Sequence, residues 1–251
     1  MSNPTQTSSL KIACLNIESD RHLDRVVPFL KKEEPDIVLL QEVLFKDIPY
    51  LEEVLQMKSV STVLNLLEWG GVPQNSGLVT FSTLPIINTH SAYYKGNKDQ
   101  LLLVYEGESA ETVAEKTSRA ILVTDIVKDG QQYRLVNTHF TWSPEGQATD
   151  EQHQNLKILF QLLSPLSDFI LCGDFNAPRG RAIFDAVASR YKDNIPLHVT
   201  TTIDKNLHRA GDLQLVVDGF FTTPHYHVES IEVFDNVSDH MAILAEVKNI
   251  S

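Results

Sequence analysis

The chain has 251 residues, of which 42% are hydrophobic and 22% charged, and its formal net charge is -12 at pH 7. This length and hydrophobic fraction suffice for a sizeable core. The acidic balance argues against a protein that tracks long nucleic acid through a basic surface, so a polyanionic substrate must meet a local cationic patch or a bound metal ion.

The predicted elements alternate between strands and helices along the whole chain. Buried apolar runs and alternating patterns predict strands, and apolar residues at helical spacing predict helices. In chain order we expect strand 12–17, helix 22–32, strand 36–40, helix 48–55, strands 76–81, 87–93 and 101–105, strands 119–127 and 133–138, helix 149–163, strand 168–173, helix 181–189, and strands 213–221, 226–234 and 241–247. Strands and helices that intermix in this way predict one α/β domain with stacked sheets and outer helices.

Local signals set several boundaries. Asp20 is the expected N-cap of the first helix. Asp129-Gly130 predicts a tight β-hairpin. A turn at Thr223-Pro224 predicts that the strands on either side of it pair with each other. The acidic segment 106–116 has no hydrophobic period, and we expect a solvated loop or a short exposed helix there, with no assigned chemistry.

Composition also predicts the domain limits of the protein, its relation to membranes and its compartment. Residues 1–9 are polar and are expected to form a disordered tail, so that residues 10–251 make up a single domain. No apolar run approaches the roughly 20 residues of a membrane-spanning helix, which predicts no stable membrane insertion. Cys14 and Cys172 lie in apolar runs and are expected to be buried thiols in a reducing, cytoplasmic compartment. A monomer is expected.

The strongest chemical signal follows the apolar run that ends in Gly173-Asp174-Phe175-Asn176. We expect Gly173 to let the backbone turn tightly. Under strand-like alternation Asp174 and Asn176 then point to the same side, where the carboxylate accepts a proton from a water molecule that the amide orients. The structural alternative is an Asx-turn that closes the strand. The apolar context favours the functional interpretation.

Two histidines stand at strand ends. His139 ends one predicted strand, and His240 precedes the last one. In the protonated state either imidazole stabilises negative charge on a transferring phosphoryl group. Asp218 interrupts an apolar run, and we predict that it bonds a ring nitrogen of His240 and fixes its tautomer. The alternatives are packed or surface histidines and a strand-end acid at a bulge.

Three oxygen-bearing side chains are candidates for a hard divalent ion. Glu42 ends a buried strand, where a carboxylate is costly unless it is solvated or bound to a cation. Asn16 interrupts an apolar run, and Asp239 is a second carboxylate. Oxygen ligands of this kind suit Mg²⁺ or Mn²⁺ better than Zn²⁺. Alternatively, Glu42 is an ordinary solvated acid and Asn16 bonds backbone.

Basic residues supply candidate phosphate contacts. Arg119 opens the strand before His139 and is either a fork donor to phosphate or a surface arginine. A further group after Asp174 either steers phosphate toward the site or forms a solvated face, and it comprises Arg179, Arg181, Arg190, Lys192, Lys205 and Arg209.

Taken together, these motifs resemble the endonuclease/exonuclease/phosphatase superfamily in their order along the chain, from Lys11 nearly to the C-terminus. The resemblance rests on Leu15-Asn16-Ile17, Gln41-Glu42, Asn137-Thr138-His139, Gly173-Asp174-Phe175-Asn176, Asp218 and Ser238-Asp239-His240. It implies a four-layer α/β sandwich, in which two stacked and mainly antiparallel β-sheets are flanked by helices.

The resemblance also implies site roles. Glu42 would be the main ligand of Mg²⁺ or Mn²⁺, with Asn16 and Asp239 near the ion. Asp174 would align or deprotonate the attacking water, and Asn176 would orient that water or a phosphate oxygen. His139 and His240 would stabilise the transition state while Asp218 orients His240. The histidine motif resembles the DNase, sphingomyelinase and tyrosyl-DNA phosphodiesterase branches more than the abasic-site endonucleases.

The sequence therefore predicts a metal-dependent phosphodiester hydrolase that works by in-line attack of an Asp-activated water, acting as a nuclease or on nucleic-acid ends. The acidic balance favours the alternative, a phosphatase or phosphodiesterase acting on a small phosphorylated molecule or a lipid headgroup. A phosphate-binding scaffold without turnover is a third alternative. It is disfavoured because no member of the catalytic set is missing.

Overall fold

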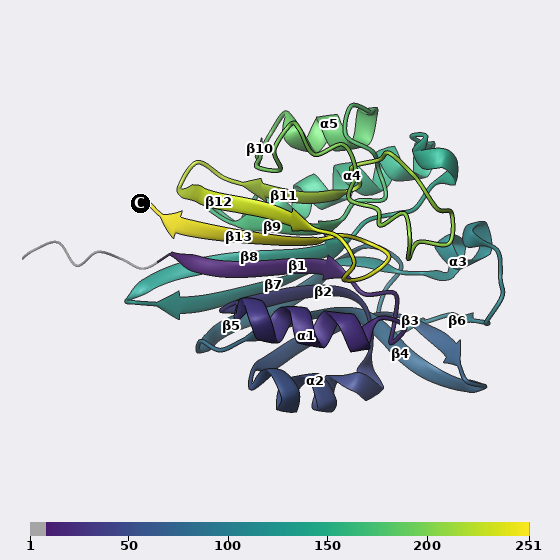
Figure 1. Ribbon diagram of the computed structural model, residues 1–251. Coiled ribbons are helices and arrows are strands. Elements are labelled where there is room, and N and C mark those ends of the chain that lie inside the picture. Colours follow the sequence, from purple (N-terminus) through teal and green to yellow (C-terminus); the bar gives the residue numbers. More distant parts are fainter. Residues whose placement is uncertain (1–8, 251) are drawn as a thin grey trace, which may run out of the picture.

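The computed structural model describes residues 9–250, and the protein folds into two β-sheets that stack face to face (Figure 1). The predicted tail lies outside the described residues except for Ser9, whose carbonyl accepts a hydrogen bond of 2.8 Å from Lys128 Nζ. The seven-stranded sheet has the order β12 (Tyr226–Phe234), β13 (Ala242–Asn249), β1 (Leu10–Asn16), β2 (Ile37–Leu44), β4 (Val72–Ser82), β3 (Lys58–Trp69) and β6 (Leu103–Val104). The six-stranded sheet has the order β10 (Lys192–Asp193), β11 (Asp218–Thr222), β9 (Ile170–Asp174), β8 (Gln131–His139), β7 (Arg119–Lys128) and β5 (Ile86–Lys95).

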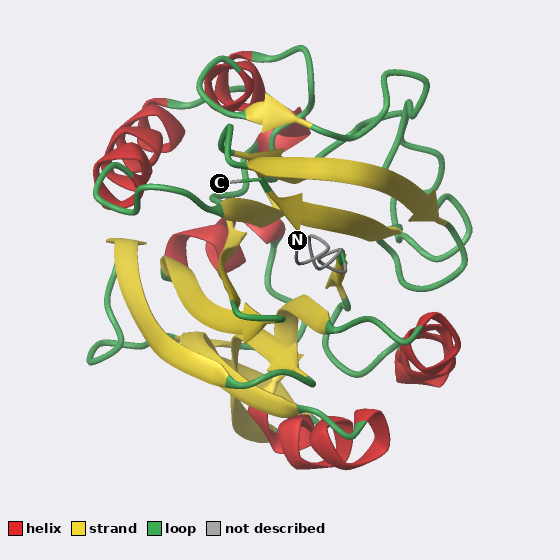
Figure 2. Cartoon of the chain, turned by 90° about the vertical axis from the view of Figure 1, so that its left-hand side faces the viewer, coloured by secondary structure: helices red, strands yellow, loops and turns green. Residues whose placement is uncertain are grey.

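Helices cover the outer faces of both sheets, which makes four layers (Figure 2). Apolar residues of α1 (Leu23–Glu33) and α2 (Ile48–Leu55) pack on the seven-stranded sheet. Those of α4 (Asp150–Leu163) and α5 (Ala182–Ala188) pack on the six-stranded sheet. Most neighbouring strands are antiparallel, as predicted. The four-layer sandwich is therefore confirmed, and no helix within residues 9–250 combines the length and apolar character needed to cross a membrane.

Local sequence explains most boundaries. The hairpin at Asp129-Gly130 is present, with positive φ at both residues. Thr149 caps α4 by accepting a hydrogen bond from the Gln152 N–H. Helix α1 begins differently from the prediction, because His22 occupies its N-cap position without a side-chain cap. Asp20 instead accepts a hydrogen bond of 2.7 Å from Lys46 Nζ.

Three predictions about strands need correction. The predicted hairpin around Thr223-Pro224 is wrong, because β11 pairs with β9 while β12 pairs with β13 in the other sheet. Residues 213–217 are not strand; the N–H groups of Val217 and Asp218 both donate to Thr202 Oγ1. Strand β3, most of whose residues are only partly buried, was not predicted at all; it joins β4 through Gly70-Gly71.

The strand pairing places the ends of strands from both sheets at one edge. The parallel pairs β1/β2 and β8/β9 bring four carboxyl ends together there. A buried hydrogen bond of 2.7 Å from Gln41 Nε2 to Asn137 Oδ1 links the two sheets just behind this edge. Asn137 also donates to the Leu40 carbonyl at 3.0 Å. Because the Asn137 amide is bonded through both its oxygen and its nitrogen, it helps to keep the two sheets in register where the polar motifs emerge.

Candidate active site

The predicted site residues converge on a cavity of about 890 Å³ at this edge of the sheets. Asn16 and Glu42 come from β1 and β2, whereas His139 and Asp174 end β8 and β9, where they are register partners. Eight predicted residues line the cavity, namely Asn16, Glu42, Arg119, His139, Asp174, Asn176, Asp239 and His240. Asp218 lies behind His240, outside the lining, and is the antiparallel register partner of Asp174.

Asp174 is the buried hub of the cluster. Its Oδ2 lies 3.2 Å from Asn16 Nδ2, 3.3 Å from His139 Nε2 and 3.8 Å from His240 Nε2. Burial alone would raise the pKa of this carboxyl, but His240, His139 and the N–H of Asn176 outweigh burial and hold the pKa well below its usual range. A carboxylate this acidic is a weak proton acceptor and a good hydrogen-bond acceptor, which suits it to orienting a water molecule.

His240 is held by the carboxylate predicted for it. Its Nδ1 lies 2.9 Å from Asp218 Oδ2 and 3.1 Å from Oδ1. Burial lowers the pKa of a histidine, yet the Asp218 and Asp174 carboxylates raise the pKa of His240 well above its ordinary value. The contact with Asp218 fixes the ring so that Nε2 faces Asp174 and the cavity. The side chain thus presents its Nε2 to the cavity.

Glu42 and Asn16 form a carboxylate–amide pair at the edge of the cavity. Glu42 adopts φ 60° where the β2–β4 register shifts, and its side chain remains 37% exposed. Asn16 Nδ2 donates to Glu42 Oε1 at 3.0 Å, while Asn16 Oδ1 accepts from the Glu18 N–H at 3.1 Å. The Glu18 N–H fixes the orientation of the amide. In this arrangement Asn16 Nδ2 donates to both the Glu42 and the Asp174 carboxylates. The expected place of Asn16 near an ion stays a prediction.

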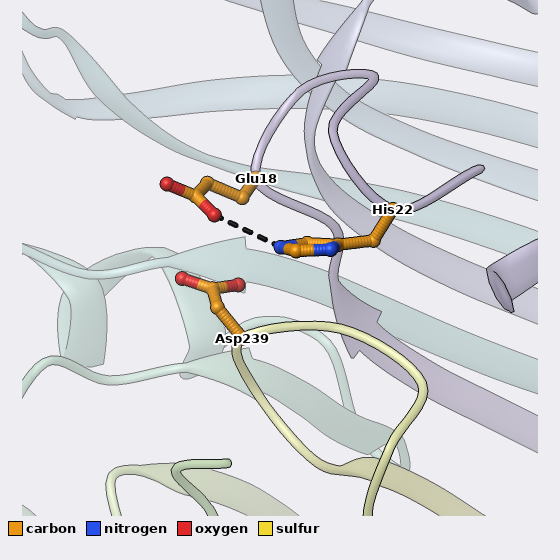
Figure 3. Close-up of side chains that lie close together, drawn as sticks. All are labelled: Glu18, His22 and Asp239. Carbon is orange, nitrogen blue, oxygen red and sulfur yellow. Dashed lines mark hydrogen bonds and ion pairs between the residues drawn. The ribbon is translucent and has the colours of Figure 1, made fainter. Parts of the chain in front are cut away.

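Asp239 stands beside two residues that sequence reasoning missed. Donor atoms of Glu18, His22 and Asp239 all lie within 4.8 Å of one another, and the Asp239 carboxylate points toward the Glu18–His22 pair (Figure 3). Burial, together with Glu42 and Glu18, raises the pKa of Asp239 to about 6. Both residues lie in the turn between β1 and α1, where no sequence pattern marks their contact.

Arg119 is a buried cation, so the surface alternative is wrong. The residue is 3% exposed, and Nη1 donates to the His139 carbonyl at 3.4 Å. Among the described residues Nε has no hydrogen-bond partner. Burial lowers the pKa of Arg119 from its usual value, although a guanidinium keeps its proton in proteins. The lining of the cavity therefore contains a fixed positive charge.

Two details of the Gly173–Asn176 segment differ from the prediction. Gly173 lies inside β9 rather than at a turn, and its φ is 149°. A Cβ there would lie 1.8 Å from the Thr138 carbonyl oxygen, so the close approach of β8 requires glycine. Asn176 has φ 49°, which breaks the strand alternation, and its Nδ2 donates to the Phe140 carbonyl at 3.0 Å.

Only some members of the basic group after Asp174 line the cavity, and others pair with residues elsewhere. Arg181 and Arg209 line the cavity. Arg179 instead pairs with Asp193 at 2.8 Å, and Arg190 lies 3.8 Å from the centre of the Phe160 ring. Sequence reasoning also missed other residues of the cavity wall, because no motif marks them: Glu108, Val113, Trp142, His208, Leu213 and Leu215.

Comparisons with solved structures agree with this architecture. An endonuclease/exonuclease/phosphatase from Bacteroides vulgatus matches with a TM-score of 0.72 and 19% identity, covering 96% of this chain and 99% of that one. The mannosyl-6-phosphatase Bt3783 of Bacteroides thetaiotaomicron gives 0.70 and 15%, covering 96% and 100%. The human Nocturnin catalytic domain with bound sulfate gives 0.68 and 15%, covering 96% and 94%. At these identities the likeness concerns the fold.

Sequence comparison identifies the family. Curated protein sequences give no significant match. A family model described as Endonuclease/Exonuclease/phosphatase family matches residues 13–240, a span that runs from β1 to His240 and includes every predicted site residue. The chain therefore belongs to the endonuclease/exonuclease/phosphatase family, whose members are hydrolytic phosphoesterases.

Proposed function

We propose that the protein is a Mg²⁺- or Mn²⁺-dependent hydrolase of small phosphate esters. The observation that carries this proposal is the cavity. Its volume of about 890 Å³ lies within the range of small-molecule sites. One wall consists of the acid, amide and imidazole cluster, and the others come from the segments around Val113 and Leu213. Figure 1 shows α3 (Ala110–Lys116) and the loop before β11 at the same end of the sheets.

The chain's own residues account for the hydrolytic step. Asp174 orients the attacking water by accepting its hydrogen bond. His240, kept in place by Asp218, and His139 donate to the phosphoryl oxygens as negative charge grows on them. Arg119 lines the cavity and supplies a fixed positive charge there, which attracts the phosphoryl oxygens. The Nε2 atoms of His139 and His240 lie 3.3 and 3.8 Å from Asp174 Oδ2, so both imidazoles stand beside the proposed position of the water.

The donor set fits a hard divalent ion. Glu42 presents a half-buried carboxylate to the cavity. Both hydrogen bonds that Asp239 accepts within the described residues go to Oδ1, which leaves Oδ2 for a cation. Glu42 and Asp239 would therefore hold the ion, and when bound it polarises the phosphoryl group and stabilises charge on the leaving oxygen.

Charge and wall composition support a small substrate over long nucleic acid. The net charge of -12 opposes extended phosphate contacts. Val113, Trp142 and Leu215 give the cavity apolar surface for the organic part of an ester. The description of the Bacteroides thetaiotaomicron relative as a mannosyl-6-phosphatase is in keeping with a small phosphorylated substrate.

A substrate panel tests this proposal. We expect kcat/KM with Mg²⁺ or Mn²⁺ to be higher on sugar phosphates, mononucleotides and p-nitrophenyl esters than on single-stranded or duplex oligonucleotides, and nearly independent of salt. A preference for the oligonucleotides, with a rate that falls steeply as salt rises, would contradict it.

Nucleic-acid ends remain a second candidate because of one specific feature. Trp142, Arg181 and Arg209 all line the cavity, and a cavity that offers both an aromatic ring and guanidinium groups suits a terminal base and its phosphates. If an end is the substrate, Trp142→Ala lowers kcat/KM on single-stranded ends far more than on p-nitrophenyl phosphate. Equal losses on both substrates would count against this candidate.

A further inference from the structure

His208 lies on the loop between β10 and β11, lines the cavity and has no part in the hydrolytic step described above. We propose that the Nε2–H of His208 donates a hydrogen bond to a phosphoryl oxygen of the bound ester, beside His240, and so helps the site to select phosphate. The proposal rests on the proposed function in one respect, namely that a phosphate group enters this cavity.

The tautomer of His208 is set by its own loop. The ring nitrogen Nδ1 accepts a hydrogen bond of 3.1 Å from the Ala210 N–H and therefore carries no proton. Burial and the neighbouring His240 lower the pKa of His208, so the ring is mainly neutral at pH 7 and holds its single proton on Nε2. Among the described residues this Nε2 makes no hydrogen bond. The half-buried ring thus offers the cavity one N–H donor without a partner in the protein.

The loop that carries His208 is tied to the segment that carries His240. Ile203 forms an antiparallel β-bridge with His240, and the N–H of the next residue, Asp204, donates to the Asp239 carbonyl at 2.8 Å. The His208 N–H in turn donates to the Asp204 carbonyl at 2.9 Å. Because these bonds form a continuous connection between the two histidines, His208 keeps a fixed place beside His240.

The spacing of the two rings suits one phosphoryl group. The ring centres of His208 and His240 lie 6.3 Å apart, and the ring planes meet at 74°. Two N–H···O hydrogen bonds of about 2.9 Å that end on one group span about 6 Å. A phosphoryl group between the rings is therefore within reach of both, with His240 donating through the Nε2 that faces the cavity.

The chemistry of this donor favours phosphate. A ring with its proton fixed on Nε2 donates there and cannot accept, and the terminal oxygens of a phosphate ester are strong acceptors. A second imidazolium this close to His240 would be repelled, whereas a neutral ring donates without that cost. The competing explanation is that His208 only closes its own turn through the Ala210 N–H.

Calorimetry with orthophosphate as the probe, in the presence of Mg²⁺, separates these explanations. His208→Phe and His208→Gln both remove the Ala210 contact, but only the glutamine keeps an N–H donor near the position of Nε2. We expect His208→Phe to weaken orthophosphate binding about tenfold or more and His208→Gln to stay within about threefold of wild type. The matched control is His198→Phe, an exposed histidine on the same loop outside the cavity lining, which should leave the affinity unchanged.

Two calorimetric results would overturn the proposal. One is unchanged orthophosphate affinity in His208→Phe; the other is an equal loss in His208→Phe and His208→Gln, because such a loss follows the Ala210 contact rather than the donor. Nitrogen NMR of the wild-type ring keeps the test decisive if the variants do not fold. We expect orthophosphate to shift the His208 Nε2 resonance, and a resonance that does not move refutes the contact. The readout is bound phosphate, so a preference for oligonucleotides in the substrate panel leaves this test untouched.

Discussion

Gly173→Ala tests whether the approach of β8 to β9 builds the site. An ideal Cβ at this position lies 1.8 Å from the Thr138 carbonyl oxygen and 2.8 Å from its carbon. Both atoms are backbone, so the strands themselves must separate by more than an ångström. Overpacking costs about 1–3 kcal/mol and the φ of 149° about as much again, and we expect a loss of about 4 kcal/mol in the free energy of unfolding.

The same displacement reaches His139 and Asp174, to which the proposed function gives catalytic roles. His139 and Asp174 are register partners one step beyond Thr138 and Gly173. Misplacement of reacting groups by about an ångström costs about 10²-fold in rate, and we expect at least that loss of kcat in the folded fraction.

Urea unfolding and steady-state kinetics measure the two effects. Gly130→Ala is the matched control, because Gly130 has a positive φ of 79° but no atom within 4 Å of its would-be Cβ. It isolates the backbone cost from the clash. Equal destabilisation of both variants, with kcat retained in Gly173→Ala, would refute the reasoning.

Three further predictions concern single charges. Asp218→Asn should lower kcat about 10- to 100-fold with little change in KM, because it loosens His240; a change confined to KM would contradict the positioning role. Arg119→Ala should raise KM for p-nitrophenyl phosphate, whereas Arg190→Ala, outside the cavity, should not; equal effects would count against a phosphate contact. Asp125→Asn should cost about 2 kcal/mol at pH 7, since Arg134 bonds both Asp125 oxygens, at 2.7 and 3.0 Å. Burial alone would raise the pKa of Asp125, but Arg134 outweighs it and lowers the pKa, so this stabilisation exists above about pH 4 and disappears as the pH falls through the folded-state pKa. A wild-type advantage of the same size at pH 3 in urea unfolding would be inconsistent with it.

Much of the fold and the cluster followed from residues whose roles are local. Apolar runs that end in polar motifs marked β1, β2, β8 and β9, and their shared edge brought Glu42, His139 and Asp174 together. The contact of Asp218 with His240 also follows from sequence, because a buried acid needs a partner.

What sequence did not reveal depends on long-range packing. The partner of β12 is chosen by its fit beside β13 rather than by the nearby turn, so the hairpin prediction failed. The orientation of the Asn16 amide is set by the Glu18 N–H, and the need for Gly173 by a carbonyl on another strand. The cavity wall around Val113 and Leu213 comes from segments without a periodic pattern, and only the folded chain assembles it.

The most direct test of the account is hydrolysis of bis-p-nitrophenyl phosphate with Mg²⁺ or Mn²⁺ by wild type and by Asp174→Ala. The account predicts that the alanine variant, folded as judged by circular dichroism, loses about 10²- to 10⁴-fold in kcat, and that EDTA abolishes the wild-type rate. Wild-type rates from both the variant and the chelated enzyme would contradict the claim that Asp174 and a divalent ion together carry the chemistry.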